Sequence, residues 1–180
     1  MHEASKNLEN IVNEGILRGI SVAFDNKCYG SAVVLIYAGI DAMAFLSMPD
    51  NQEDVNRNDF INWVDTYLEF NSENQVSGLE LYGARCGMVH NYGMFSRLSR
   101  EGKVRVIGYV DEVQDDIMID QTGESSLVLI SIRGFAYAFS QAIEKFVESV
   151  WNDEERMKTI NERLRKLVQS IDLPEELKAS

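Results

Sequence analysis

Two side chains with complementary chemistry lie five residues apart near the middle of the chain. Arg85 carries a planar guanidinium that can bind a phosphate through two hydrogen bonds, and His90 carries an imidazole that exchanges a proton near neutral pH. Tyr92 follows them. Gly83 and Gly87 lie in the same segment, where glycine lowers helix stability and so indicates close approach of another group. If the chain has an active site, this segment is the best candidate.

These residue types suit metal-independent phosphoryl chemistry on RNA. One imidazole can take the proton of a ribose 2′-hydroxyl, and another can protonate the leaving 5′-oxygen. An arginine can hold the non-bridging oxygens while charge builds in the transition state. The sequence contains no P-loop, no Gly-x-Ser-x-Gly segment and no grouping of acids and histidines on one face suited to a metal. We therefore expect no metal and no other cofactor.

A helical wheel of residues 78–93 separates the two side chains. At about 100° per residue, Arg85 and His90 lie about 140° apart, on opposite flanks of the expected core-facing stripe. They can converge if the helix breaks near His90, or if two copies pack with Gly83 and Gly87 facing each other. The second option predicts a symmetric dimer with a composite site. The expected core-facing residues are Leu79, Tyr82, Cys86, Val89 and Gly93.

Each of these residues also has a purely structural interpretation. Arg85 can form a scaffold salt bridge with Asp41 or another acid, and His90 can be a hydrogen-bonded residue at the edge of the core. Tyr92 can be an ordinary core residue. The two glycines can simply let two helices of one bundle approach each other.

The charge distribution singles out the same region. The net charge of −12 argues against nonspecific nucleic-acid binding by the whole surface. Residues 81–105, in contrast, hold five basic side chains and one acidic one, and we call them the basic island. A second basic group, at residues 156–166, suits the solvated face of a terminal helix. The candidate RNA phosphate contacts in the basic island are Arg97, Arg100, Lys103 and Arg105.

Length and composition predict one ordered domain. With 180 residues and 45% apolar residues, the chain is large enough to bury a core without disulfides or metals. Cys28 and Cys86 form neither a disulfide framework nor a zinc motif, and the N-terminus lacks signal-peptide features, so we expect a cytoplasmic protein. Residues 31–48 are long enough to span a membrane, but Asp41 near their middle favours a buried core helix and no membrane contact.

Hydrophobic periodicity predicts six helices that position the motif. They cover residues 5–24, 28–47, 60–70, 78–92, about 133–150 and a segment that begins after Asp153. The expected caps are Asn26, Ser77 or an earlier residue of the same loop, and Asp153, and Pro174 marks the end of the last helix.

A small β insertion is expected after the fourth helix. The β-branched runs at 104–110 and 117–119 predict a short antiparallel hairpin, and residues 126–132 can begin as a strand. The predicted parts of the single domain are the helices that carry the motif (1–95), the β-hairpin insertion (96–132) and the C-terminal helices (133–180).

The candidate segment resembles a known motif. Its residues Arg85-Cys86-Gly87-Met88-Val89-His90-Asn91-Tyr92 are similar to the RX4HXY motif of HEPN domains, helical bundles found in prokaryotic toxins, abortive-infection proteins and CRISPR-associated ribonucleases. The run from Leu35 to Asp41 is similar to the HEPN helix that carries an acidic residue. The resemblance covers residues 1–95. It implies a mainly α fold, a HEPN-like antiparallel helical bundle with the β-hairpin insertion after its fourth helix.

The same resemblance implies a function. It indicates a homodimer with facing motifs and a metal-independent endoribonuclease, acting as a toxin or a phage-defence component. Arg85 would bind phosphate and His90 would act as the acid and base. Asn91 and Tyr92 would orient them, and Asp41 would fix a motif side chain.

The resemblance also suggests partners and an alternative. In toxins paired with a minimal nucleotidyltransferase, the tyrosine that matches Tyr92 is a target of neutralising nucleotidylation, so an antitoxin of that type is a possible partner. The alternative is a catalytically inactive HEPN-like module that binds RNA, a nucleotide or a protein. The acidic surface favours this alternative, since it repels long RNA outside the basic island.

Overall fold

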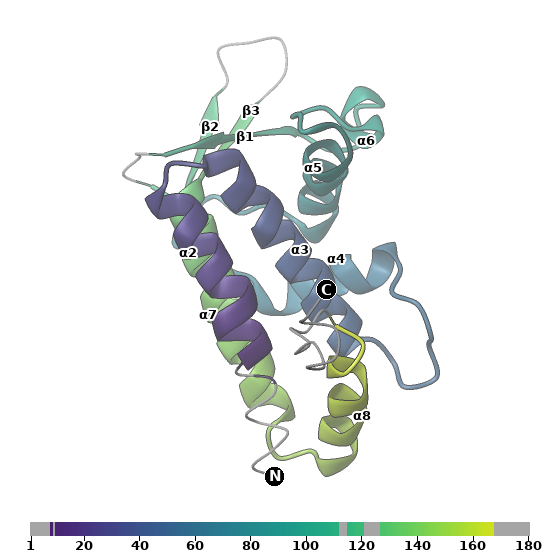
Figure 1. Ribbon diagram of the computed structural model, residues 1–180. Helices are drawn as coiled ribbons and strands as arrows, with labels where there is room; N and C mark the ends of the chain where they lie inside the picture. Colours follow the sequence, from purple (N-terminus) through teal and green to yellow (C-terminus); the bar gives the residue numbers. More distant parts are fainter. Residues whose placement is uncertain (1–7, 9, 112–114, 121–126, 168–180) are drawn as a thin grey trace, which may run out of the picture.

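The computed structural model describes residue 8 and residues 10–111, 115–120 and 127–167, and it shows a mainly helical protein with one small sheet (Figure 1). Its helices are the π-helix η1 (Asn10–Leu17) and the α-helices α2 (Arg18–Asp25), α3 (Tyr29–Ser47), α4 (Arg57–Tyr67), α5 (Gly78–Asn91), α6 (Arg97–Arg100), α7 (Ile132–Val150) and α8 (Glu154–Leu164). Its strands are β1 (Val106–Val110), β2 (Ile117–Asp120) and β3 (Leu127–Ser131).

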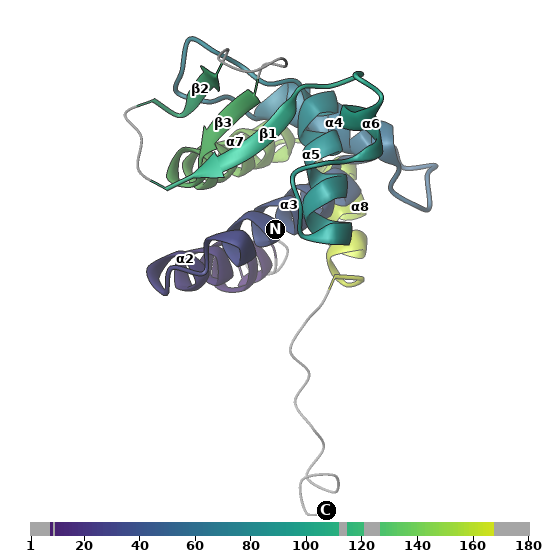
Figure 2. The ribbon, with the colours of Figure 1, turned by 90° about the horizontal axis from the view of Figure 1, so that it is seen from above.

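α3 is the centre of the bundle. It lies between α2 and α7 on one side and α4, α5 and α8 on the other (Figures 1 and 2). Ile36, Tyr37, Ile40 and Met43 of α3 have no exposed surface, and neither has Phe139 of α7. Among the described residues, α3 is the helix long and apolar enough to cross a membrane, and half of the tested window is buried inside the protein. This burial agrees with the predicted core helix.

The predicted caps have different outcomes. Ser77 forms a capping box with Glu80 at the start of α5, and Asp153 caps α8, as predicted. The prediction for Asn26 is wrong. Asn26 lies at the C-terminal end of α2, where its side-chain amide donates to the carbonyl of Val22. A short polar side chain can hydrogen-bond the neighbouring backbone at the end of a helix as well as at its start.

The helix boundaries also differ in places. The first predicted helix consists of two elements, because η1 has π-helical hydrogen bonding and only α2 is an α-helix. α4 begins earlier than predicted, since Asn56 and Asp59 form a capping box there. The short α6 was not predicted. The predicted start at residue 5 and Pro174 lie outside the described residues.

The predicted antiparallel hairpin is wrong. β1 and β2 do not pair with each other, because β3 lies between them, parallel to β1 and antiparallel to β2. β3 is nearly all apolar, and its Val128 and Ile130 are fully buried, which favours the central position in a sheet. The strand expected within residues 126–132 is therefore the one that organises the sheet. β1, at the edge, packs against α5.

Candidate functional site

α5 carries the motif and is fixed at both ends. At its start, the Gly78 amide donates to Asp65 Oδ1 at 2.6 Å, and a Cβ on Gly78 would lie 2.5 Å from the Ile61 carbonyl oxygen, so glycine lets α5 approach α4 closely. At its end, Tyr92 is left-handed (φ 51°) and its amide donates to the Met88 carbonyl at 3.0 Å. These two ends determine the direction of every side chain between them.

The predicted core-facing stripe of α5 is wrong except for Tyr82, which is partly buried against the core. The large side chains that enter the core are Leu81 and Met88, with Ala84 between them, whereas Val89 is 38% exposed. α5 contacts α3, α4, α6 and β1, so several of its faces are covered at once. When several faces of a helix are covered, the positions of its apolar residues on a helical wheel do not show which face points into the core.

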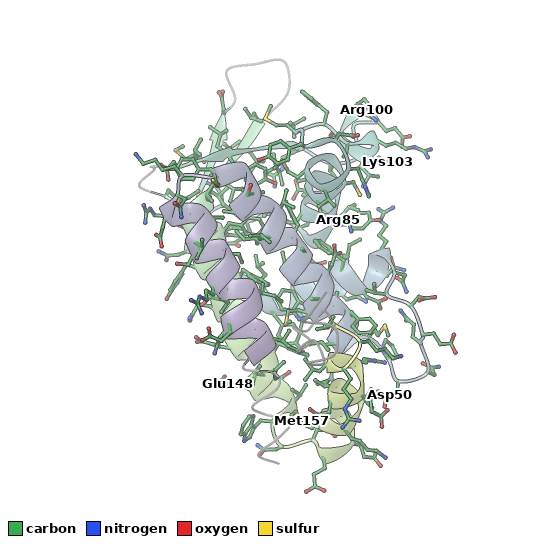
Figure 3. All side chains as sticks on the ribbon, in the orientation of Figure 1. Asp50, Arg85, Arg100, Lys103, Glu148 and Met157 are labelled. Atoms are coloured by element: carbon green, nitrogen blue, oxygen red, sulfur yellow. The ribbon has the colours of Figure 1, made fainter. Side chains whose placement is uncertain are left out.

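Arg85 is the centre of a three-residue network. Its Nε and Nη2 donate to Oδ2 of Asp41 on α3, at 3.0 and 2.8 Å, and its Nη1 lies 3.3 Å from Nε2 of His90. The prediction that a straight helix keeps Arg85 and His90 apart is therefore wrong. A helical wheel shows only the direction in which each side chain leaves the helix. The guanidinium of arginine is carried on three methylene groups and can extend along the helix axis. Arg85 is labelled on α5 in Figure 3.

The network is only partly buried. The side chains of Arg85 and Asp41 retain 21% and 30% of their exposure, and His90 is exposed. Burial raises the pKa of the Asp41 carboxyl, and the hydrogen bond from Arg85 offsets this only in part. Burial lowers the pKa of Arg85, but the hydrogen bond and charge of Asp41, together with the Cys86 thiol, outweigh that effect and raise the pKa. Arg85 thus remains a cation that is oriented by Asp41 and accessible from solvent.

Tyr82 and Arg57 extend the network toward α4, and sequence analysis missed both as site residues. The Arg57 guanidinium carbon lies 5.3 Å from the centre of the Tyr82 ring, and Phe60 packs edge-on against the same ring. Burial raises the pKa of the Tyr82 hydroxyl, and so does the Cys86 thiol, while the charges of Arg85 and Arg57 oppose the rise. The available signal was the spacing of Tyr82, four residues before Cys86 and three before Arg85.

Tyr92 does not contact the network through its hydroxyl. Its side chain is 64% exposed, and a Cβ on Gly30 would lie 2.0 Å from the Tyr92 hydroxyl oxygen. Gly30 precedes Asp41 by eleven residues of α3, about 16 Å along a helix. The alternative that Tyr92 is a core residue is wrong, whereas its predicted role in orienting Arg85 and His90 stays a prediction. Asn91 is exposed at the last position of α5.

The two glycines of α5 are covered by the chain itself. A Cβ on Gly87 would lie 2.6 Å from the Gly93 carbonyl oxygen, and one on Gly83 would lie 2.9 Å from Val104 Cγ2. The prediction that they face a second copy is wrong, because the returning segment 93–104 fills that space. The alternative, in which they allow close packing within one bundle, is correct in kind, because the neighbours are the short helix α6 and the loops on either side of it.

The cations of the basic island are largely paired. Arg97 and Lys103 both bind Glu101, at 2.6 and 2.7 Å. Arg105 forms an ion pair with Glu80 and also donates to the Gln75 carbonyl, so it ties β1 to the start of α5. The prediction that Arg105 contacts phosphate does not suit this paired, partly buried position. The exposed cations that remain candidates lie on and after α6, where Figure 3 labels two of them. They are Arg97, Arg100 and Lys103.

The Glu80–Arg105 pair makes folding stability depend on acid pH. Burial raises the Glu80 pKa, but the hydrogen bonds from Arg105 and Ser77 together outweigh burial, so the pKa in the folded protein lies below 4.5. The contribution of Glu80 is therefore present above about pH 4.5 and is lost as the pH falls through the folded pKa. We expect Glu80→Gln to lower the free energy of unfolding at pH 7 by about 1.5–3 kcal/mol. Urea unfolding from pH 7 to pH 3 measures this.

The control for that experiment is Glu14→Gln, which removes an exposed ion pair with Arg18. Its unfolding curve should match that of the unmodified protein at each pH. If Glu80→Gln and the unmodified protein lose stability in parallel below pH 4.5, the assigned role of Glu80 is wrong.

The described residues contain no group of three or more His, Cys, Asp or Glu side chains placed to hold a metal ion. The chemical groups that the structure brings together are thus one oriented guanidinium, one exposed imidazole beside it and the carboxylate that holds the guanidinium. Comparison of the chain with protein-family models, with curated proteins and with solved structures gives no match.

Proposed function

We propose that this protein is a metal-independent endoribonuclease that acts at Arg85 and His90. The observation that carries the proposal is the 3.3 Å contact between Arg85 Nη1 and His90 Nε2, made while Asp41 holds the other side of the guanidinium. A phosphate-binding cation and a proton-transfer group therefore lie side by side at an accessible surface. The resemblance of residues 85–92 to the HEPN motif supports the same function.

The hydrogen bonds suggest the first step. Because arginine only donates, we assign His90 Nε2 as the acceptor in this contact, with the proton of the neutral imidazole on Nδ1. A non-bridging oxygen of an entering phosphate would replace His90 Nε2 as the acceptor of the hydrogen bond from Arg85 Nη1. The Nε2 lone pair is then free to accept the 2′-hydroxyl proton. The 2′-oxygen then attacks phosphorus and the P–O5′ bond breaks. The products are a 2′,3′-cyclic phosphate and a 5′-hydroxyl.

The leaving 5′-oxygen needs a proton from a second group. In the proposed homodimer, His90 of a second copy, in its protonated imidazolium form, supplies that proton across a shared cleft and is left neutral. The surface between the copies does not include Gly83 or Gly87, which the chain itself covers. Sedimentation of the purified protein tests this part, since a monomer at assay concentration would contradict it.

Incubation with RNA tests the activity directly. Purified protein should cleave total RNA or transfer RNA in excess EDTA and leave fragments with 2′,3′-cyclic phosphate ends. RNA that stays intact over a range of protein concentrations would contradict the proposal.

We further propose a cytoplasmic role as a toxin or phage-defence component. Tyr92 is 64% exposed and is the expected target of a nucleotidyltransferase-type antitoxin. Expression should arrest growth, and co-expression of such an antitoxin should relieve the arrest by modifying Tyr92.

One observation favours a second candidate, a catalytically inactive HEPN-like module. Two of the hydrogen-bond donors of Arg85 are used by Asp41, whose charge also neutralises the guanidinium. Both effects weaken the binding of phosphate by Arg85. Such a module would bind RNA, a nucleotide or a protein at the same surface without cutting RNA. Binding of RNA without cleavage in the assay above would support it.

A further inference from the structure

Exposed apolar side chains gather at the end of α5 and in the loop after it. Val89 is 38% exposed, Tyr92 64%, Met94 43% and Phe95 55%, and these four lie within seven residues of chain. We call residues 92–95 the aromatic loop. A group of large apolar side chains exposed to water in one short segment is typical of a surface that binds a ligand or a partner.

The backbone of the aromatic loop is fixed. The Gly93 amide donates to the Gly87 carbonyl at 3.2 Å, and the missing side chain of Gly87 leaves room for the carbonyls of Gly93 and Phe95. Directly after the loop, Ser96 is 4% exposed and caps α6. Phe95 is therefore presented to solvent from a backbone that is anchored on both sides, so little ordering is needed when it binds a ligand.

The charge next to the aromatic loop selects the class of ligand. α6 follows immediately with Arg97 and Arg100, and Lys103 comes after it, against Glu101 alone. Figure 3 shows Arg100 and Lys103 together at the α6 end of the molecule. In a chain of net charge −12, this group of cations next to exposed aromatic rings favours a polyanion over an ordinary protein surface. Exposed aromatic rings beside cations are typical of proteins that bind single-stranded nucleic acid.

We propose that Phe95, with Tyr92, is a stacking platform for unpaired nucleobases, so that the substrate is single-stranded RNA. This inference rests on the proposed function for the cleavage site, whose His90 precedes Phe95 by five residues in the chain. A base flanking the bound phosphate stacks on Phe95, and Arg97 and Arg100 hold the backbone beyond it. Duplex RNA is excluded, because its base faces are stacked on each other and cannot reach an exposed phenyl ring.

Binding to an uncleavable strand tests the platform. The probe is a fluorescein-labelled, 2′-O-methyl 12-residue RNA of mixed sequence, measured by anisotropy in EDTA, alone and annealed to its complement. We expect the single strand to bind at least tenfold more tightly than the duplex. Phe95→Ala should weaken single-strand binding about 5- to 150-fold, as expected for loss of one base–aromatic stack, and Phe95→Trp should restore it.

The matched control is Tyr137→Ala. Tyr137 is an equally exposed aromatic residue (61%) on α7, and the views place α7 on the other side of α3 from α5. This variant should bind the single strand like the unmodified protein.

Three outcomes would overturn the proposal. They are equal binding of single strand and duplex, unchanged binding by Phe95→Ala, and a change of oligomeric state in Phe95→Ala by sedimentation, which would assign the aromatic loop to a contact between copies. Failure of the proposed function is separate. If the single strand binds through Phe95 but cleavable RNA remains intact, the platform is confirmed and the nuclease proposal fails. If RNA is cleaved and Phe95→Ala cuts it equally well, the platform fails and the nuclease stands.

Discussion

His90→Ala should lower the rate of RNA cleavage by at least about 100- to 10,000-fold, the usual contribution of one general acid–base group, because in the proposed dimer the variant loses both the base and the acid. In the proposed mechanism His90, whose Nε2 lies next to Arg85 Nη1, is the group that accepts the 2′-hydroxyl proton. Because His90 is exposed at the end of α5, its removal should leave the fold intact. Single-turnover cleavage rates in EDTA, with thermal unfolding of the same samples, measure both effects.

Two further variants make that result interpretable. Arg85→Lys keeps the charge but cannot hold Asp41 and a phosphate together, so cleavage should fall in this variant too. Arg18→Ala removes an exposed cation from α2 and should cleave at the normal rate. Cleavage by His90→Ala within threefold of the unmodified rate would show that the imidazole is structural.

Gly87→Ala should destabilise the protein by about 1–3 kcal/mol, equivalent to roughly 2–12 °C in Tm. The new Cβ would lie 2.6 Å from the Gly93 carbonyl oxygen and 3.2 Å from that of Phe95. Both are backbone atoms, so they cannot rotate away as a flexible side chain can. The aromatic loop must move away from α5, and RNA binding through Phe95 should weaken along with stability. Thermal unfolding by circular dichroism measures the first effect.

Gly19→Ala is the matched control for Gly87→Ala. Gly19 also lies in an α-helix, but its added Cβ would meet only Leu35 Cδ1 at 3.7 Å, an ordinary contact. This variant should gain about 0.5–1 kcal/mol, the usual effect of replacing a helical glycine by alanine. If both variants are stabilised, the packing of the aromatic loop on Gly87 is not as described.

Local signals predicted the helices well and the sheet poorly. Ser77 and Asp153 each accept a hydrogen bond from a residue three positions away, so their caps are readable from neighbouring sequence. The order of the strands is not readable in this way. β1 and β2 are neighbours in sequence, but β3 lies between them because its apolar side chains are the most deeply buried in the sheet.

The candidate site shows the same division. The Arg85–Asp41 pair could be anticipated as one option, because an acid inside an apolar helix requires a partner. The contact of Arg85 with His90 could not, since it depends on the rotamer of a long side chain. The neighbours of Gly83 and Gly87 could not be predicted either, because they come from a segment that folds back without periodicity of its own.

The central position of α3 has a consequence for synthesis on the ribosome. α3 ends at residue 47 and α7, which covers it, ends at residue 150. At about 5–20 residues per second, roughly 5–20 s pass between the two. For that interval a 19-residue helix of predominantly apolar side chains has emerged without a main part of its cover. The nascent chain is therefore most open to aggregation, or to capture by chaperones, before α7 is made.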